Sequence, residues 1–138
     1  MKKTGSASNQ QPIEMRAALR TIAMPADTNS NGDIFGGWLL SQMDLAGSII
    51  AAETSQSRIA TVGVEAMTFH RPVYVGDEVT CYAEIFKIGT TSIAIQIETW
   101  ARRIRENRSV KVTEGRFTYV AIGENRTPIP VIRSKKAE

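Results

Sequence analysis

The sequence predicts an α+β fold in which a five-stranded antiparallel sheet is wrapped around one long central helix. One apolar segment, residues 37–53, has the length of a helix, and a shorter apolar segment precedes it. Four later segments have the alternating, β-branched pattern of strands. Short turns separate the last three of these segments, which makes them antiparallel neighbours. The order of elements is therefore one strand, one long helix and four strands.

The predicted elements have recognisable boundaries. The first strand, 20–24, is stopped by Pro25, and the polar loop after it contains Asp33, which is placed to cap the next helix. The helix begins near Phe35 to Gly37 and ends near Glu53, where the apolar period stops. The remaining strands are predicted at 60–69, 79–88, 92–104 and 110–122.

One helix can cover only one face of a five-stranded sheet. The other face and the sheet edges would remain uncovered in a monomer. Because exposed sheet edges invite pairing, we expect an obligate oligomer whose edges pair across a twofold axis.

The composition is that of one soluble globular domain. The chain has 138 residues, of which 42% are hydrophobic and 22% charged, and it is long enough for one core. We expect a flexible tail at 1–16, one domain at 17–132 and a basic tail at 133–138. A single cysteine, Cys81, excludes an internal disulfide and fits a reducing cytoplasm. Neither a signal peptide nor a run of about 20 apolar residues is visible, so we expect no membrane partner.

The net charge of +3 is unevenly distributed, because arginines and lysines gather between residues 102 and 116. This bias permits a polyanionic partner, such as a nucleotide-bearing molecule or a nucleic acid. The alternative is a charged sheet edge that resists aggregation. No aromatic residue lies between Arg102 and Lys111, which argues against a nucleic-acid-binding module.

Asp44 is the residue of the predicted helix that most needs an explanation. It lies among Leu40, Met43, Leu45 and Ala46. A carboxylate in apolar surroundings is costly to keep ionised. Asp44 is therefore either a hydrogen-bonded acid that fixes the packing of the helix or an acid with a chemical role.

Residues 20–47 carry a resemblance to a known family. Their sequence, RTIAMPADTNSNGDIFGGWLLSQMDLAG, resembles the opening of the bacterial YciA-type acyl-CoA thioesterases and each hotdog repeat of the mammalian cytosolic acyl-CoA hydrolases. Shorter matches follow, so the resemblance covers about residues 17–132; they are VGVEAMTF at 62–69, PVYVGD at 72–77, KIGTTS at 87–92 and FTYV at 117–120.

The resemblance implies a hotdog fold and an activity in fatty acid metabolism. The activity would be hydrolysis of acyl-CoA to free CoA and a carboxylic acid. The family has its site at a dimer interface, with residues from both subunits, and assembles as a trimer of dimers. No cofactor is implied, because CoA is part of the substrate or product.

The resemblance also assigns catalytic positions. It places the catalytic acid at Asp44 and its partner asparagine, from the facing subunit, at Asn29. Asp44 would act as general base on water or attack the thioester to form an anhydride. Backbone N–H groups of Gly36 or Gly37 would hold the oxyanion, because free amides and the helix dipole favour negative charge there. The alternative role of Asn29 is an Asx turn, and the nearby Asn31 is the other candidate for the catalytic asparagine. The alternative role of the two glycines is to allow close contact between the helix and the sheet.

A CoA substrate also needs a groove for its pantetheine arm and cations for its phosphates. The strand at 62–67 could offer backbone groups to the pantetheine amides, and the polar turn at 87–92 suits the nucleotide end. Arg103 is a further basic candidate. The residues expected to bind CoA are Thr61, Val62, Val64, Arg71, Lys87, Gly89, Thr91 and Ser92.

Other chemistries have little support in the sequence. It contains no Gly-x-Ser-x-Gly motif, and Cys81 has no evident base beside it. The single histidine, His70, cannot form a pair of metal ligands, so we expect no metal and interpret His70 as a packed or surface residue. A hotdog dehydratase would need its own histidine–acid arrangement. A non-catalytic acyl-CoA sensor on the same fold is the alternative, although retention of both Asp44 and Asn29 argues against it.

Overall fold

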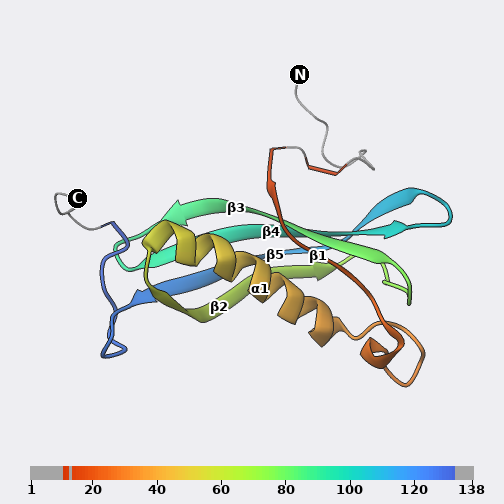
Figure 1. The fold of residues 1–138 in the computed structure, drawn as a ribbon, viewed down its shortest axis with the longest axis horizontal. Coiled ribbons are helices and arrows are strands. Elements are labelled where there is room, and N and C mark those ends of the chain that lie inside the picture. The colour runs from red at the N-terminus through yellow and green to blue at the C-terminus, as the bar shows by residue number, and fades with distance from the viewer. Residues whose placement is uncertain (1–10, 13, 133–138) are drawn as a thin grey trace.

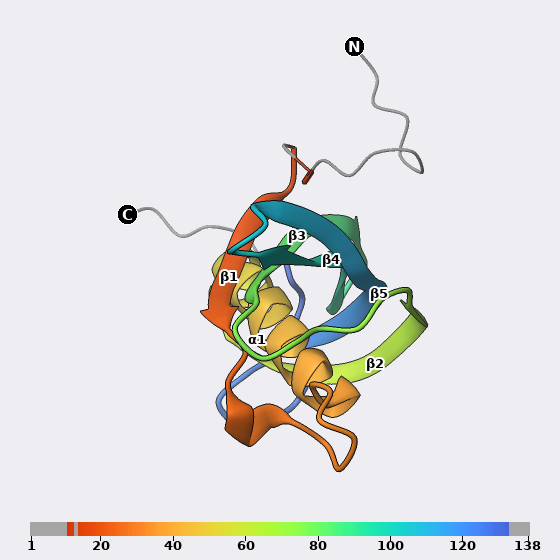
Figure 2. The ribbon, with the colours of Figure 1, turned by 90° about the vertical axis from the view of Figure 1, so that its right-hand side faces the viewer.

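The computed structural model describes residues 11, 12 and 14–132, which form one five-stranded antiparallel sheet around one α-helix. The helix, α1 (Gly36–Ser55), lies in the concave face of the curved sheet (Figures 1 and 2). The strands lie in the order β1-β3-β4-β5-β2, so β1 and β2 form the two edges. Their bounds are β1 (Arg16–Ile22), β2 (Arg58–Phe69), β3 (Glu78–Ile88), β4 (Ser92–Arg103) and β5 (Arg108–Ile122).

This arrangement confirms the predicted fold class and the antiparallel pairing of the last three strands. The first strand was misplaced, because β1 begins at Arg16 rather than near Arg20 and ends at Ile22. Its register against β3 contains a bulge between Ala17 and Leu19. After Ile22 the chain leaves the sheet, and the backbone N–H of Ala23 donates to the Asp77 carbonyl oxygen at 3.0 Å. The segment 25–27 then forms a short 3₁₀ helix, η1 (Pro25–Asp27).

The two predicted tails lie largely outside the described residues. Residues 133–138 are not described at all. In the N-terminal segment, Gln11 is described and donates a hydrogen bond from its Nε2 to Ser109 Oγ at 2.9 Å. Arg16, the last residue of the predicted tail, is the first residue of β1.

The core lies between α1 and the central strands. Met43, Ala46 and Ile50 of the helix pack against a layer from β3, β4 and β5 that includes Ile95 and Phe117. Each fully buried Ile, Met or Phe side chain contributes about 1.5–3 kcal/mol relative to an exposed one. This layer fixes which side of the helix faces the sheet.

Two sets of apolar side chains remain exposed in the protomer. On the helix surface away from the core, Leu45 is 53% exposed and Ile49 37%. On the edge strand β2, Val62 is 60% exposed and Val64 43%. Within the described part of the chain, no helix is both long enough and apolar enough to cross a membrane.

Candidate active site

Asp44 lies in the middle of α1 and points to the edge strand β2 rather than into the core. Its Oδ1 accepts a hydrogen bond of 2.7 Å from the Thr61 hydroxyl. Its neighbour Met43 is fully buried against the sheet. One residue along an α-helix turns the side chain by about 100°, so the packing of Met43 directs Asp44 to the rim of the core, where it is partly exposed.

The backbone at Asp44 is held from the other side by Tyr119 of β5. The Tyr119 hydroxyl donates to the Asp44 carbonyl oxygen at 2.9 Å, and the tyrosine is fully buried. Burial, and next the nearby negative charge of Asp44, raise the pKa of Tyr119 well above its ordinary value, so it remains a donor. A Cβ on Gly47 would collide with the Tyr119 hydroxyl oxygen and lie 2.9 Å from Cζ. Glycine at 47 is therefore what lets the ring reach the helix.

Tyr119 and Gly47 were missed as site residues. Tyr119 lies far from the motif in sequence, and only the fold brings it to Asp44. Gly47 did carry a signal, because a glycine within a helical apolar pattern indicates close approach of another group.

Asn29 closes the loop before the helix. Its Oδ1 accepts hydrogen bonds from the backbone N–H groups of Asn31 at 2.8 Å and Asp33 at 3.1 Å. This is the Asx turn considered as the alternative role. Because two N–H donors fix the amide oxygen, the Nδ2 group is the one left to donate, and within the described residues it has no hydrogen-bond partner. Asn31 takes part in the turn through its backbone, not its side chain.

Gly36 and Gly37 are the first two residues of α1. Phe35 occupies the N-cap without a side-chain hydrogen bond, so the prediction that Asp33 caps the helix is wrong. The reason is that the N–H of Asp33 bonds back to Asn29 and the helix starts three residues later. The Phe35 carbonyl oxygen accepts from the N–H groups of residues 38 and 39. The N–H groups of Gly36 and Gly37 have no acceptor among the described residues.

The two glycines differ in their surroundings. A Cβ on Gly36 would lie 3.6 Å from Phe69 Cζ, which is ordinary van der Waals contact. A Cβ on Gly37 would meet nothing within 4 Å. Close helix–sheet packing within the described protomer therefore requires glycine at neither position.

The residues predicted to bind CoA fall into three separate places. Thr61, Val62 and Val64 lie on β2 beside α1. Arg71 follows β2, on the segment joined to the loop before α1 by the 3.2 Å hydrogen bond from Ile34 N–H to the Val73 carbonyl oxygen. The third group, Lys87, Gly89, Thr91 and Ser92, belongs to the β3–β4 turn, at the end of the sheet where α1 ends (Figure 1).

Two residues of the third group, Gly89 and Ser92, bond to each other within the β3–β4 turn. Gly89 N–H donates to the Ser92 carbonyl oxygen at 2.8 Å, and a Cβ on Gly89 would lie 2.8 Å from Ser92 Oγ. Lys87 is exposed. One protomer therefore does not bring the three groups of CoA candidates together.

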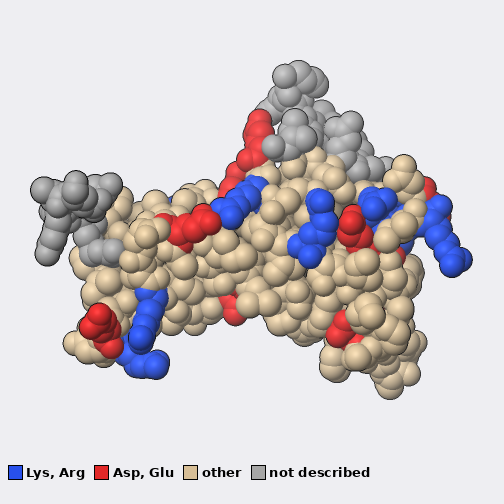
Figure 3. Space-filling model, viewed as in Figure 1, with Lys and Arg blue, Asp and Glu red and all other residues tan. Residues whose placement is uncertain are grey.

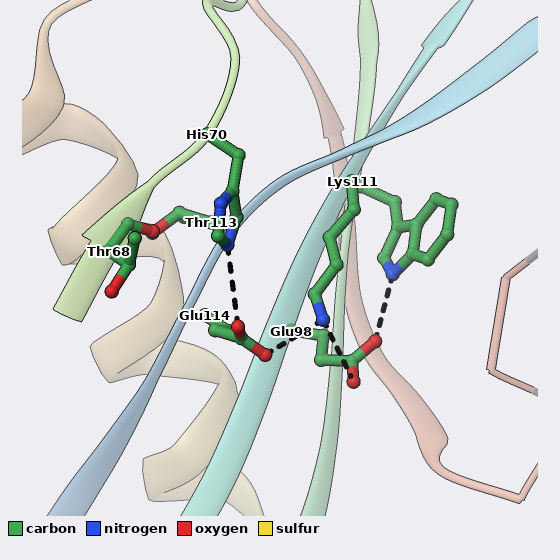
Figure 4. A network of polar contacts seen from close by, with 7 residues as sticks. Thr68, His70, Glu98, Lys111, Thr113 and Glu114 are labelled. Carbon is green, nitrogen blue, oxygen red and sulfur yellow. Dashed lines mark hydrogen bonds and ion pairs between the residues drawn. The ribbon is translucent and has the colours of Figure 1, made fainter. Parts of the chain in front are cut away.

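His70 belongs to a polar network on the face of the sheet opposite α1 (Figure 4). Its Nε2 lies 3.3 Å from Glu114 Oε2, and Lys111 bridges Glu114 and Glu98. Partial burial opposes ionisation of Glu114, but the Lys111 ammonium and His70 outweigh it and lower the pKa of this carboxyl. Its partners make His70 a half-exposed member of a surface network, as interpreted from the sequence.

Cys81 is not a candidate nucleophile. It is fully buried in the core, its sulfur lies 3.5 Å from the Thr99 hydroxyl, and burial raises the pKa of its thiol to about 11. Among the described residues, no group of three His, Cys, Asp or Glu side chains is placed to hold a metal ion.

Comparison with known proteins identifies the family. Residues 31–107 match the model of the thioesterase superfamily. The acyl-CoA thioester hydrolase YciA of Salmonella typhimurium is 55% identical over 116 residues, which are 82% of this chain and 87% of the relative. The chain belongs to the thioesterase superfamily, and the predicted YciA-type membership is confirmed.

The hotdog fold is confirmed by the solved structure of a hexameric hotdog fold thioesterase of Campylobacter jejuni, which matches with a TM-score of 0.80 and 39% identity, over 84% of this chain and 90% of that chain. A hexameric thioesterase from Yersinia pestis matches with a TM-score of 0.82 and 50% identity, over 88% of this chain and 98% of that chain. HI0827, described as a hexameric broad specificity acyl-coenzyme A thioesterase, matches with a TM-score of 0.84 and 43% identity, over 91% and 86% of the two chains.

Proposed function

We propose that this protein hydrolyses acyl-CoA thioesters to free CoA and a carboxylic acid, with Asp44 as the general base or nucleophile. The observation that carries the proposal is the arrangement around Asp44. Thr61 orients its carboxylate, Tyr119 holds its backbone, and two N–H groups at the start of the same helix have no acceptor within the described part of the chain. The names of the relatives support acyl-CoA as the substrate class.

Asp44 can act by either of two routes. As a general base it takes a proton from water while the water oxygen attacks the thioester carbon; the C–S bond then breaks, and the thiolate takes the proton back. As a nucleophile its own oxygen attacks that carbon, the thiolate leaves, and water hydrolyses the resulting anhydride. The Thr61 hydroxyl occupies Oδ1, so Oδ2 is the atom that takes the proton or attacks.

The N–H groups of Gly36 and Gly37 are suited to the oxyanion of the tetrahedral intermediate. Free amides at a helix start bear partial positive charge that favours an anion. The space beside Gly37 is open in the protomer, so a thioester can approach the backbone closely. Loss of one oxyanion donor commonly lowers the rate by about 10²–10³-fold.

The active site is completed, in this proposal, by Asn29 of a second copy. The edge strand β2 exposes Val62 and Val64, and α1 exposes Leu45 and Ile49, so the protomer leaves apolar surface beside Asp44 for a partner. Pairing of β2 with its twofold copy would extend the sheet and cover this surface. It would also bring together CoA candidates that one protomer keeps apart.

Hexameric relatives support a further assembly of these dimers, which we propose is a trimer of dimers. CoA enters as part of the substrate and leaves as product, so no cofactor is required. A buried thiol such as Cys81 is compatible with the cytoplasm as the site of action.

The test is thiol release from a panel of acyl-CoAs, from acetyl to palmitoyl, by the purified full chain. Asp44→Asn should abolish release, whereas Glu53→Gln, an exposed carboxylate on the same helix that pairs with Arg16, should retain it. Acyl-CoA binding without thiol release would instead favour the non-catalytic sensor. Activity of Asp44→Asn within a few-fold of the parent would refute the assigned role of Asp44.

A further inference from the structure

We propose that a pocket at the end of the molecule where α1 begins binds the phosphate-bearing end of a nucleotide. The pocket has a volume of about 810 Å³ and lies between the 70–77 segment and the β4–β5 hairpin. Lys and Arg side chains gather at this end, on the right of Figure 3. Arg71, Arg103, Arg105 and Arg108 all line the pocket.

Arg103 builds the wall of the pocket rather than offering its charge to a ligand. Its side chain is 12% exposed, its Nη1 lies 3.1 Å from Asp77 Oδ2, and its Nη2 donates to the Pro72 carbonyl oxygen at 3.2 Å. Its guanidinium also lies over the Tyr74 ring, 4.7 Å from the centroid. Arg103 thus holds the 72–77 turn at three points and joins it to the end of β4.

Those remaining arginines carry charge that the protomer does not neutralise. Among the described residues, Arg71 and Arg105 have no ion-pair partner, and both are exposed. Arg108 has only a long contact, 3.9 Å to Glu106, in which both side chains are more than 60% exposed. Like charges held around one pocket repel one another, and a polyanion would relieve that repulsion. The planar guanidinium favours phosphate oxygens as ligands.

The same pocket offers an aromatic surface for a base. Arg103 packs over the Tyr74 ring, yet Tyr74 remains 47% exposed. Ile104, another lining residue, is 45% exposed on the hairpin side. An aromatic ring beside arginines suits a nucleotide, because the base can stack on the ring while the phosphates pair with the guanidinium groups.

Two sources of this ligand share the same chemistry: a free nucleotide, and the nucleotide end of CoA. The CoA source rests on the proposed function. The pocket segment is joined to the loop before α1 by the Ile34–Val73 hydrogen bond, so the pocket lies close to the start of the catalytic helix. The free-nucleotide source does not depend on catalysis.

The first measurement is calorimetric titration of the full chain with ADP, adenosine and inorganic pyrophosphate. We expect ADP and pyrophosphate to bind, adenosine to bind far more weakly, and the ADP affinity to fall as salt is raised. Arg105→Gln should weaken ADP binding about tenfold or more. Arg126 is also exposed and has no ion-pair partner in the described residues, so Arg126→Gln should leave ADP affinity within twofold. Absence of ADP and pyrophosphate binding, or equal effects of the two variants, would overturn the proposal.

Tyr74→Leu distinguishes binding of the base from binding of the phosphates. It should weaken ADP binding about fivefold or more and leave pyrophosphate binding unchanged, provided thermal melting shows the variant to be folded. An equal loss for both ligands would contradict the stacking role.

Steady-state kinetics then identify the source of the nucleotide. If the pocket holds the nucleotide of CoA, Arg105→Gln raises KM for acyl-CoA and leaves KM for the matching acyl-pantetheine unchanged. If it holds a free nucleotide, ADP binds while both KM values stay the same. Either result supports the pocket. If the protein binds ADP but releases no thiol from acyl-CoA, the proposed function is refuted and the pocket stands. If it releases thiol but does not bind ADP, and Arg105→Gln leaves KM for acyl-CoA unchanged, the pocket is refuted and the proposed function stands.

Discussion

The hydroxyl of Tyr119 on β5 donates a 2.9 Å hydrogen bond to the backbone carbonyl oxygen of Asp44 in the middle of α1. The tyrosine is fully buried, and it reaches the helix beside Gly47, where any side chain would collide with it. The core of the sheet therefore holds the backbone of the proposed catalytic acid, while Thr61 of the edge strand holds its carboxylate.

Tyr119→Phe removes the donor and keeps the ring. We expect a loss of about 1 kcal/mol in the free energy of unfolding, typical of one hydrogen bond. We also expect a fall in kcat of about tenfold or less with little change in KM, because the carboxylate stays in place but its backbone is held less firmly. Urea unfolding and steady-state kinetics measure the two effects. A stability loss with unchanged kcat would assign Tyr119 a purely structural role.

Gly47→Ala tests the close approach of the tyrosine. The added methyl would collide with the buried ring, so either the ring or the helix must shift. We expect destabilisation of about 1–3 kcal/mol, the usual cost of overpacking a core. The double variant with Tyr119→Phe should recover only part of this loss, because the ring carbons are also too close to the new methyl. Thermal unfolding of the single and double variants gives the comparison, and full recovery would show that the hydroxyl alone causes the clash.

Thr61→Val removes the hydroxyl that bonds to Asp44 and keeps the shape of the side chain. We expect a fall in kcat of about tenfold or more, because the carboxylate loses the 2.7 Å hydrogen bond that orients it. Thr61→Ser keeps the hydroxyl and should retain most of the activity. If the serine and valine variants lose activity equally, packing of the threonine methyl group matters rather than its hydrogen bond.

The polar network of His70, Glu114, Lys111 and Glu98, on the face of the sheet opposite α1, leads to a prediction about stability and pH. Lys111 and His70 lower the pKa of Glu114 in the folded protein, against the opposing effect of partial burial. A carboxyl with a lowered folded pKa contributes stability that is complete above its unfolded value of about 4.3 and is lost as the pH falls through the folded value. We therefore expect the melting temperature of the parent to fall below about pH 4.3 more steeply than that of Glu114→Gln. Parallel curves for the two proteins would show that the network contributes nothing.

The sequence was sufficient to predict the helix and the later strands because those elements are long and strongly patterned. The structure places the ends of β2 to β5 within two residues of the predicted ends. β1 was less predictable: it is an edge strand whose register, including a bulge, is decided by its pairing with β3. Its own sequence carries little alternation.

The site was predictable only where chemistry is local. Asp44 was singled out because a carboxylate in an apolar helix needs a hydrogen-bond partner, access to water or a chemical role, and its catalytic role stays a prediction. The Asx turn at Asn29 follows from residue type and neighbouring backbone. The contacts of Asp44 with Thr61 and Tyr119 depend on how α1 crosses two strands, and no pattern along the chain encodes that crossing angle. The basic pocket likewise joins segments about 30 residues apart, which the charge bias alone could not locate.

A shared site between subunits predicts that two inactive variants can rescue each other. Asp44→Asn lacks the acid and Asn29→Ala lacks the asparagine, but a mixed dimer contains one site that retains both groups. After unfolding and joint refolding at equal concentrations, half of the dimers are mixed and one of their two sites is intact, so about a quarter of the parent activity should return. Asn29 also closes the Asx turn, so Asn29→Asp, which keeps an accepting oxygen but loses the NH₂ donor, serves as a second partner that preserves the loop. Subunit exchange can be followed with a tagged copy. Exchange without any return of activity would show that each site is built from a single chain.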